Sequence, residues 1–585
     1  MNEVWNLDRM YTGFDDPKFE ADFATFQAKI AEFMAFTKEL ESGEPLENLR
    51  TGIRLQEELE CVSDCLGSYP HLRAATNAND MDAVSQSGRL MSTYSNMAGA
   101  NAVFRQWVCS VPNLMELVDR DDYLKDYHFM FQGMLDMHSY DLSPEASQVS
   151  AKLGMSGASA WSKLQGELTS TVPVHYRGTV TNLSSIRNLA YDADPQVRKD
   201  AYDAEIACYE AIKAPVAHAL NAIKLQTISD CQLRGYESPL ARTLKHSDME
   251  KATLDAMLGA MDEYLPKFWQ YLKAKAKQLG HENGLPWYDL FAPMGDASSS
   301  FTTEEAKAFL LEQFSTFDSE LTEMVRKAFD EAWIDFFPRD GKRGGAFCSS
   351  IHAIGESRIL TNYDGMFTDV VTLAHELGHA FHNLCIHDHR PLNRDYSMPV
   401  AETASTFNEC VVMNAAIKAA KDKQEKIALI ESQLQDATQI ICDIYSRFRF
   451  EAAVFANREA KFMNADALCQ LMLEAQKQSY GDGLDHNCLH PYMWVCKSHY
   501  YGPTFYNFPY AFGGLFARGL YAQYEKEGAA FVPKYKKLLH TTPVATAEDT
   551  AKVAGIDLTD KEFWRAALQT IADQIDMLCA LWEEV

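Results

Sequence analysis

Two histidines and one glutamate stand in this chain at a spacing that suits hydrolysis on a metal ion. Residues 375–379 read HELGH. In a helix, His375 and His379 lie one turn apart on one face, so their neutral imidazoles can share one zinc ion. Glu376 stands beside the first histidine, where its carboxylate can take a proton from a water on that ion. The pattern therefore predicts a hydrolytic zinc site on a helix.

The residues around this motif predict a helix with a buried back face. Apolar side chains recur there at helical spacing, at Leu373, Ala374, Leu377, Ala380, Phe381 and Leu384. Such a stripe is typical of a helix that packs against a core. The alternative is a helix with ordinary surface histidines, and the apolar stripe favours the buried site over it.

A catalytic zinc needs a third protein ligand and one open position, and a second run of residues offers two carboxylates for this purpose. Pro399 can open a helix, which places Glu402 in its first turn. Glu409 follows seven residues later on the same face. We predict Glu402 as the third ligand and Glu409 as the partner that orients a ligand histidine. The alternative for both is a solvated glutamate on an amphipathic helix.

His382 is the rival third ligand, because it lies about one turn beyond His379. Three ligands along one straight helix close poorly into a tetrahedron, since His375 and His382 would be about 10 Å apart along the axis. We therefore expect His382 to support a ligand or to face the substrate.

Few segments predict strands, and those that do precede the predicted zinc helix. Residues 346–352 and 357–362 are expected to form a short hairpin. Zinc peptidases commonly hold the substrate as an added strand on such an edge, and Gly344 and Gly345 before Ala346 would let a peptide backbone approach. A sheet that only braces the helix is the alternative.

Several of these segments resemble one enzyme family. The runs HELGHAFH (375–382), NYDG (362–365), AETASTFNE (401–409), GGAFC (344–348) and WNLD (5–8) are similar to the oligoendopeptidase F branch of the thimet oligopeptidase-like zinc peptidases. The resemblance covers nearly the whole chain. It implies one zinc ion per chain and a mainly α, two-lobed helical fold with a deep central channel and a small β-sheet beside the zinc helix. Such a channel admits short flexible peptides and rejects folded proteins.

The resemblance also assigns roles to residues. It implies His375, His379 and Glu402 as zinc ligands, with Glu376 as the general base. The family carries a segment rich in histidine and tyrosine that faces the zinc, and here it spans residues 498–513. A developing oxyanion needs a donor besides the metal. Tyr510 is the first choice for that donor, and Tyr506 and His499 are expected to contact the substrate; for most of the other rings, packing is the alternative.

Composition excludes several other classes of protein. The chain has 585 residues and a formal net charge of −28, which opposes binding to nucleic acid. The start of the sequence lacks the basic and apolar regions of a signal peptide, and no run of about 18 apolar residues predicts a membrane span. Without a secretory signal, the 13 cysteines are expected to be free thiols. We predict a cytoplasmic protein that binds neither nucleic acid nor membranes.

The remaining sequence predicts long helices with weak boundaries between them. Residues 186–230 form a helical stretch nearly free of glycine and proline, and a capping box at Thr302 and Glu305 opens a helix that reaches about residue 336. Gly513 and Gly514 are expected to interrupt an apolar helix at about 509–527.

Three regions are predicted along the chain. They are an N-terminal helical region (1–115), a small module like that of oligoendopeptidase F (116–185) and a catalytic domain (186–585).

These features together predict a zinc endopeptidase that acts on short unstructured peptides. An exopeptidase, such as a zinc carboxypeptidase, is the nearest alternative. A non-catalytic peptide-binding protein with a structural zinc is a second one, although such a site has no use for Glu376. The sequence leaves the oligomeric state and the cleavage preference open.

Overall fold

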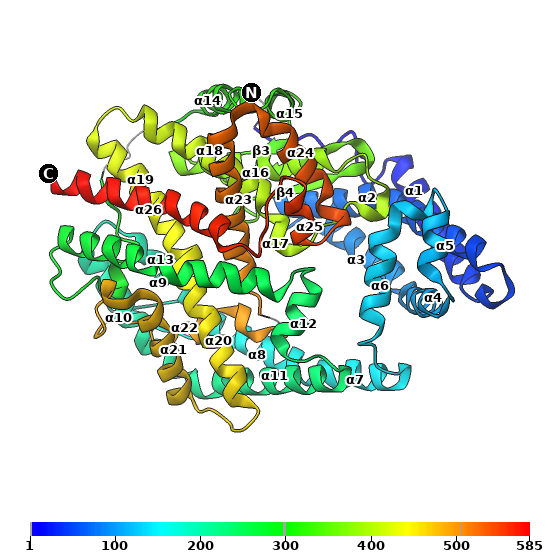
Figure 1. The fold of residues 1–585 in the computed structure, drawn as a ribbon, viewed down its shortest axis with the longest axis horizontal. Helices are drawn as coiled ribbons and strands as arrows, with labels where there is room; N and C mark the ends of the chain where they lie inside the picture. Colours follow the sequence, from blue (N-terminus) through cyan, green and yellow to red (C-terminus); the bar gives the residue numbers. More distant parts are fainter. Residues whose placement is uncertain (1–2, 296–299, 504, 585) are drawn as a thin grey trace.

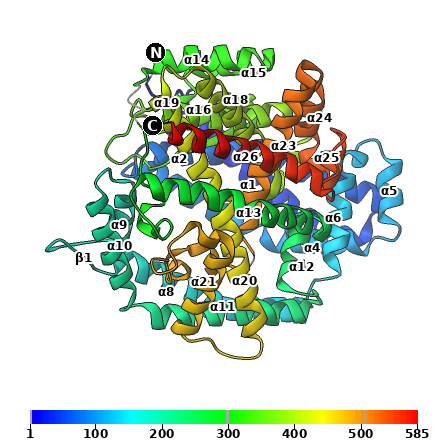
Figure 2. The same ribbon diagram turned by 60° about the vertical axis from the view of Figure 1, so that its left-hand side comes forward.

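Most of the chain is helical, and its helices gather around three hydrophobic cores. The protein is seen here in a computed structural model that describes residues 3–295, 300–503 and 505–584. Figure 1 shows the first helices at one side of the molecule, and Figure 2 gives the view turned by 60°.

Six helices at the N-terminal side enclose the first core, which extends from Trp5 to Phe131. They are α1 (Pro17–Phe36), α2 (Pro45–Thr76), α3 (Met81–Ser95), α4 (Ala98–Ser110), α5 (Leu114–Arg120) and α6 (His128–His138). Phe19, Phe23 and Phe33 recur at helical spacing along α1 and are buried against this core.

A second group of elements lies along the lower edge of both views. It comprises α7 (Pro144–Ser156), α8 (Ala158–Thr171), β1 (Val174–Tyr176), β2 (Thr179–Thr181), α9 (Leu183–Asn188), α10 (Pro195–Tyr209), α11 (Lys213–Arg234), α20 (Ile444–Arg458), α21 (Ala465–Tyr480) and α22 (Met493–Cys496). The core of this group joins residues 172–223 to residues 450–501, with Trp494 and Tyr500 fully buried in it. Segments far apart in the sequence are therefore held together here.

The largest core belongs to the elements that carry the predicted site. They are α12 (Pro239–His246), α13 (Lys251–Gln278), α14 (Thr303–Ser315), α15 (Ser319–Asp330), α16 (Phe367–Cys385), α17 (Met398–Ala401), α18 (Thr403–Ala419), α19 (Lys423–Thr438), α23 (Phe508–Glu527), α24 (Val532–Thr541), α25 (Ala547–Lys552) and α26 (Lys561–Glu583). A π-helical turn, Gln439–Asp443, joins α19 to α20.

A three-stranded sheet lies beside α16, and its strand order is β3 (Ile334–Asp335), β5 (Glu356–Leu360) and β4 (Phe347–Ile351). β3 is parallel and β4 antiparallel to the central strand. Side chains alternate between the two faces of β5, so Ile359 packs in the largest core and Leu360 in the N-terminal core. The predicted hairpin is confirmed, and one edge of β4 is left without a partner strand among the described residues.

Two of the long helices expected from the sequence are divided by local capping. The capping box of Thr302 and Glu305 is present, but α14 ends at Ser315, and the Asp318 side chain caps α15. Likewise residues 186–230 form three helices, because Asp194 accepts a hydrogen bond from a backbone N–H of the next helix, which Pro195 opens.

Gly513 and Gly514 do not interrupt their helix, contrary to the prediction. α23 runs unbroken through both residues. A Cβ atom at Gly513 would lie 2.9 Å from the Cβ of Glu402, and one at Gly514 would lie 3.0 Å from a methyl carbon of Ile440. The two glycines therefore let neighbouring elements approach α23, a use that local sequence does not reveal.

The mainly helical class with a small sheet beside the predicted zinc helix is confirmed. The boundaries that divide 1–115, 116–185 and 186–585 stay a prediction. In the described part of the chain, no helix combines the length and the apolar character that crossing a bilayer requires.

Candidate active site

Three side chains from two neighbouring segments converge at the predicted metal site. Glu402 Oε2 lies 3.3 Å from Nε2 of His375 and 3.4 Å from Nε2 of His379. Potential ligand atoms of the three side chains all lie within 4.8 Å of one another. Within residues 3–295, 300–503 and 505–584, this is the one group of three or more His, Cys, Asp or Glu side chains that meets so closely.

A glycine inside the motif permits this convergence. A Cβ atom at Gly378 would lie 2.5 Å from the carbonyl oxygen of Ala404 and from Cα of Ser405, so only glycine lets α16 and α18 cross at this distance. Asn408 of α18 also donates a hydrogen bond to the Ala374 carbonyl of α16, at 3.2 Å. The crossing brings the carboxylates after Pro399 to the two histidines.

Glu402 occupies a joint between helices and not the first turn of one helix. Pro399 opens α17 as predicted, but this helix ends at Ala401, and α18 begins at Thr403. The Ser405 hydroxyl donates a hydrogen bond to Glu402 Oε2 at 2.7 Å. The prediction that one helix carries Glu402 in its first turn is therefore wrong, although the carboxylate still reaches the histidines.

Glu409 contacts the far side of His375, at 2.5 Å between Oε1 and Nδ1. Because a carboxylate accepts, Nδ1 carries the proton in the neutral ring, and in that form Nε2 has its lone pair free for a metal ion. Burial lowers the pKa of His375, but the hydrogen bond and the charge of Glu409 more than offset it and raise that pKa to about 9. Burial and the neighbouring His375 lower the pKa of His379 to about 4.

Glu376 is buried beside this group, with 5% of its surface exposed. Its Oε2 has no hydrogen-bond partner within the described structure. Burial raises the pKa of this carboxyl to about 7, the charge of His375 opposes the rise, and Glu402 and Glu409 add to it. A carboxyl group with a pKa near neutrality is suited to accept a proton and to return it.

The donor set fits a catalytic metal ion. Two imidazole nitrogens and one carboxylate oxygen are a known ligand set for catalytic zinc, which keeps one coordination position open. A cavity of about 480 Å³ lies over the set and is lined by His375, Glu376, His379 and Glu402, together with Ala346 and Phe347. Space for a substrate therefore adjoins the donors.

His382 does not join the cluster. It is fully buried, its Nε2 lies 2.8 Å from the Thr542 hydroxyl, and its ring stacks on Tyr396 at 4.1 Å between centroids. Burial lowers its pKa to about 3, so the ring is neutral at physiological pH. The structure thus places His382 of α16 in the packing against Tyr396 and Thr542 and not among the converging donors.

His499, Tyr506 and Tyr510 form an aromatic group of their own. The ring of His499 stacks on Tyr506 at 5.1 Å, and Tyr510 meets both rings edge-on at 5.9 and 5.7 Å. Burial, a hydrogen bond with Tyr506 and the charge of Glu402 raise the pKa of Tyr510, which stays a proton donor. Tyr510 is one helical turn from Gly513, which adjoins Glu402.

Gly344, Gly345 and Ala346 lead into β4 next to the cavity. Gly345 has a φ of +80°, which glycine adopts without strain, and a Cβ atom at either glycine would meet nothing within 4 Å. Asn362 fixes this segment by donating a hydrogen bond to the Gly345 carbonyl at 2.7 Å.

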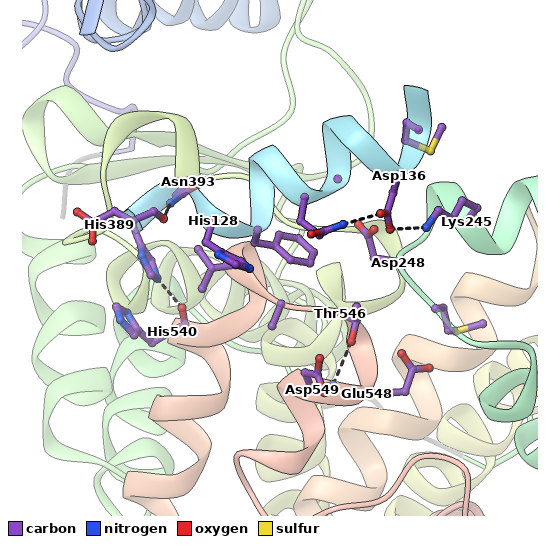
Figure 3. A pocket seen from close by; sticks show the side chains of 18 of the residues that line it. His128, Asp136, Lys245, Asp248, His389, Asn393, His540, Thr546, Glu548 and Asp549 are labelled. Carbon is purple, nitrogen blue, oxygen red and sulfur yellow. Dashed lines mark hydrogen bonds and ion pairs between the residues drawn. The ribbon is translucent and has the colours of Figure 1, made fainter. Parts of the chain in front are cut away.

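A larger cavity lies elsewhere, and Figure 3 shows the side chains that line it. It measures about 960 Å³ and lies between α6 and the segments around Lys245, His389 and Glu548. None of the predicted site residues lines it. The volume of a cavity alone would therefore locate the active site away from the converging donors.

The sequence prediction missed residues that shape the site without binding the metal. Gly378 allows the helix crossing, and Tyr396 lines the cavity and covers His382. A glycine in the middle of a helix was a signal for Gly378, since it destabilises a helix unless something packs closely there. Tyr396 carries no such signal.

Known proteins resemble this chain over most of its length. Residues 188–570 match the family described as Peptidase family M3, and residues 112–172 match Oligopeptidase F. Oligopeptidase PepF of Bacillus subtilis is 22% identical over 98% of this chain and 86% of that protein. Group B oligopeptidase PepB of Streptococcus agalactiae is 27% identical over 66% of this chain and 64% of its own.

Solved structures share the fold. A peptidase from Chlamydophila abortus superposes with a TM-score of 0.85 at 19% identity, over 99% of this chain and 98% of the other. Oligoendopeptidase-F from Enterococcus faecium has a TM-score of 0.72 at 17% identity, over 97% and 100% of the two chains.

Fold and site together define a helical metallopeptidase. The match to the M3 family covers more than half of the chain, so the chain belongs to peptidase family M3. It is thus a hydrolase of peptide bonds that uses a metal ion.

Proposed function

We propose that this protein is a zinc-dependent oligoendopeptidase that hydrolyses internal bonds of short, unstructured peptides. One observation carries the proposal: His375, His379 and Glu402 converge, and the unpartnered carboxylate oxygen of Glu376 is buried beside them. Relatives named oligoendopeptidase F and oligopeptidase support the same substrate class. The metal site, the base and the substrate are the parts of this proposal that experiments must test.

Nε2 of His375, Nε2 of His379 and a carboxylate oxygen of Glu402 would hold the zinc. When bound, zinc would supply Lewis acidity toward the scissile carbonyl and would lower the pKa of a water molecule toward about 7. Glu409 keeps the ring of His375 in the required tautomer by accepting a hydrogen bond from its Nδ1–H.

Glu376 moves the proton in this mechanism. Its free Oε2 accepts a proton from the attacking water as the new C–O bond forms at the scissile carbonyl carbon. The same carboxyl then delivers the proton to the leaving nitrogen as the C–N bond breaks. The raised pKa of Glu376 suits both steps, because neither protonation state is strongly favoured near neutral pH.

Tyr510 is the proposed donor to the oxyanion. Its phenol keeps the proton because burial and nearby charge raise its pKa. A hydroxyl donor fixed by the fold stabilises charge that develops on the carbonyl oxygen. His499 and Tyr506 pack edge-on against the ring of Tyr510 and are proposed to contact the peptide backbone.

The unpaired edge of β4 is proposed to bind the substrate as an added strand. Phe347 and Cys348 of this strand line the cavity together with Glu376. An extended peptide on that edge would pass the donor cluster, and the open space at Gly344 and Gly345 would leave room for its backbone. An extended segment can enter such a site, whereas a folded protein cannot present one.

Cleavage of a peptide blocked at both ends tests the endopeptidase proposal against an exopeptidase. Mass spectrometry of the products should show cuts at internal bonds of a peptide with an acetylated N-terminus and an amidated C-terminus. Products that appear only when one end is free would assign the protein to the exopeptidases instead.

We also propose a cytoplasmic location. All 13 cysteines are free thiols, and eight of them are only partly buried or exposed. Free thiols of this kind persist in a reducing compartment.

A further inference from the structure

A second cavity shares His375 with the first and has no other lining residue in common with it. It measures about 570 Å³, within the range of ligand sites, and its walls come from α16, α18, α19 and α23. Glu409 lines it, so the cavity begins directly behind the donor cluster. A peptide that passes the cluster can extend into this space.

Arg518 of α23 lines this cavity without a partner. Its side chain is nine-tenths buried, with 8% of the residue surface exposed. Within residues 3–295, 300–503 and 505–584, no hydrogen bond and no ion pair is formed by its guanidinium. A largely buried cation that opens onto a cavity and has no anion partner is available to an anionic ligand there.

Gln433 of α19 is a second polar group of the same kind. It is 5% exposed and lines the same cavity. Its side-chain oxygen Oε1 has no hydrogen-bond partner among the described residues. Two buried polar side chains from facing helices are therefore left without partners around one space.

The acidic groups in the cavity do not form an ion pair with Arg518. Glu409 is engaged with His375, and Asp436 lies beyond ion-pair distance of the guanidinium. Burial raises the pKa of Asp436 to about 6, the charge of Glu409 adds to the rise, and Arg518 opposes it. The charges of Asp436 and Arg518 therefore interact across the cavity at long range. The N–H groups of Arg518 stay available for hydrogen bonds.

We infer that Arg518, together with Gln433, forms a subsite that binds a carboxylate of the peptide substrate. The planar fork of a guanidinium matches a carboxylate through two parallel hydrogen bonds, and the side-chain N–H of Gln433 adds a donor, while its Oε1 is free to accept from a backbone N–H of the same peptide. The carboxylate is either the free C-terminus of a short peptide or the side chain of an Asp or Glu residue. The inference rests on the proposed peptidase function.

The position of Arg518 sets how far this carboxylate lies from the cleaved bond. Arg518 follows Tyr510 by eight residues, a rise of about 12 Å along α23. An extended peptide covers that distance in roughly three to four residues. We therefore expect the subsite to bind a carboxylate that lies about three to four residues from the scissile bond.

Peptide kinetics with matched substrates test the subsite. Four peptides share one sequence and carry either a free or an amidated C-terminus, combined with either Glu or Gln four residues from the cleaved bond. Arg518→Met should lower kcat/KM about 10- to 100-fold for the peptide whose carboxylate is bound, and should leave its neutral counterpart within about twofold. A loss confined to the free-acid and amide pair identifies the C-terminus, and a loss confined to the Glu and Gln pair identifies a side chain.

Two further variants separate a local contact from a general loss of charge. Arg518→Lys keeps the charge without the fork and should lose less than Arg518→Met. Lys526→Met removes an exposed cation from the same helix and should leave the preference unchanged. An equal loss for all four peptides, no loss for any of them, or the same loss in the Lys526→Met variant would overturn the inference.

Binding measurements keep this test separate from the proposed function. Calorimetry on proteins that also carry Glu376→Gln compares the affinity for the charged and neutral peptides without turnover. If the parent protein cleaves peptides but neither affinity nor kcat/KM depends on Arg518, only the subsite fails. If the parent cleaves none of them, the peptidase proposal fails, and an Arg518-dependent affinity for the charged peptide would still support the subsite.

Discussion

Two cavities of this protein that contain histidines differ in what the imidazole nitrogens contact. In the larger cavity, His389 and His540 stack at 4.0 Å, and their nitrogens lie 2.6 and 3.0 Å from backbone carbonyl oxygens, with Asp388 3.3 Å from His540 alone (Figure 3). In the smaller cavity, the Nε2 atoms of His375 and His379 approach one carboxylate from another segment. Convergence of donor atoms, and not the volume of the space, therefore distinguishes the candidate active site.

Carboxylates of the larger cavity also have partners within the protein, although Glu548 Oε2 has none among the described residues. Asp136 pairs with Lys245 at 2.7 Å, and Glu548 accepts a hydrogen bond from the backbone N–H of Glu250 at 2.9 Å. Glu402 and Glu376 instead keep oxygens directed at one shared space. Free ligand atoms converge where their elements pack closely together, which Gly378 and Gly513 permit here.

Removal of the third ligand should have the largest effect. Glu402→Ala deletes one of three donors and should reduce bound zinc from about one ion per chain to nearly none, with loss of peptidase activity. Metal content after dialysis, measured by atomic emission, checks this. His540→Ala in the other cavity is the control and should retain the metal; full retention by Glu402→Ala would place the third ligand elsewhere.

Replacement of the base should separate binding from catalysis. Glu376→Gln keeps the shape of the side chain but cannot accept the proton, so kcat should fall about 10³- to 10⁴-fold while the metal stays bound. Steady-state kinetics and metal content measure the two effects. Turnover near the parent rate would contradict the assigned role.

Loss of one hydroxyl should have a smaller effect. Tyr510→Phe removes the proposed oxyanion donor and should lower kcat about 100-fold with little change in KM. Tyr506→Phe is the matched control on the neighbouring ring, and its effect should be several-fold at most. Equal effects of the two variants would assign the donor to neither tyrosine.

The close approach of α23 to Glu402 provides the smallest expected effect. Gly513→Ala places a methyl group 2.9 Å from the Cβ of Glu402 and should lower the free energy of unfolding by about 1–3 kcal/mol. Zinc affinity should weaken with it, because Glu402 must move. Gly67→Ala is the control, since its Cβ would meet nothing within 4 Å, and thermal denaturation compares the two.

Local patterns made much of this structure predictable. The i, i+4 histidines, the apolar stripe beneath them, the capping box at Thr302 and the hairpin before the zinc helix all depend on near neighbours in sequence. The helix carrying Gly513 was misjudged because its glycines serve contacts with residues more than 70 positions away.

Other features depend on tertiary approach and leave no local trace. Glu402 was chosen from its distance to a proline, yet it lies at a joint between two helices that the sequence did not reveal. In the sequence, Arg518 is one charged residue in an apolar helix. Only the fold shows that it lines a cavity beside the converging ligand side chains.

The most direct test of the account is hydrolysis of an internally quenched fluorescent peptide blocked at both ends. We expect cleavage by the purified protein, loss of cleavage after treatment with a chelator, and its return when about one equivalent of zinc is added. Cleavage that persists in the chelated, dialysed protein, or a zinc-loaded protein that cleaves no peptide, would contradict the central claim.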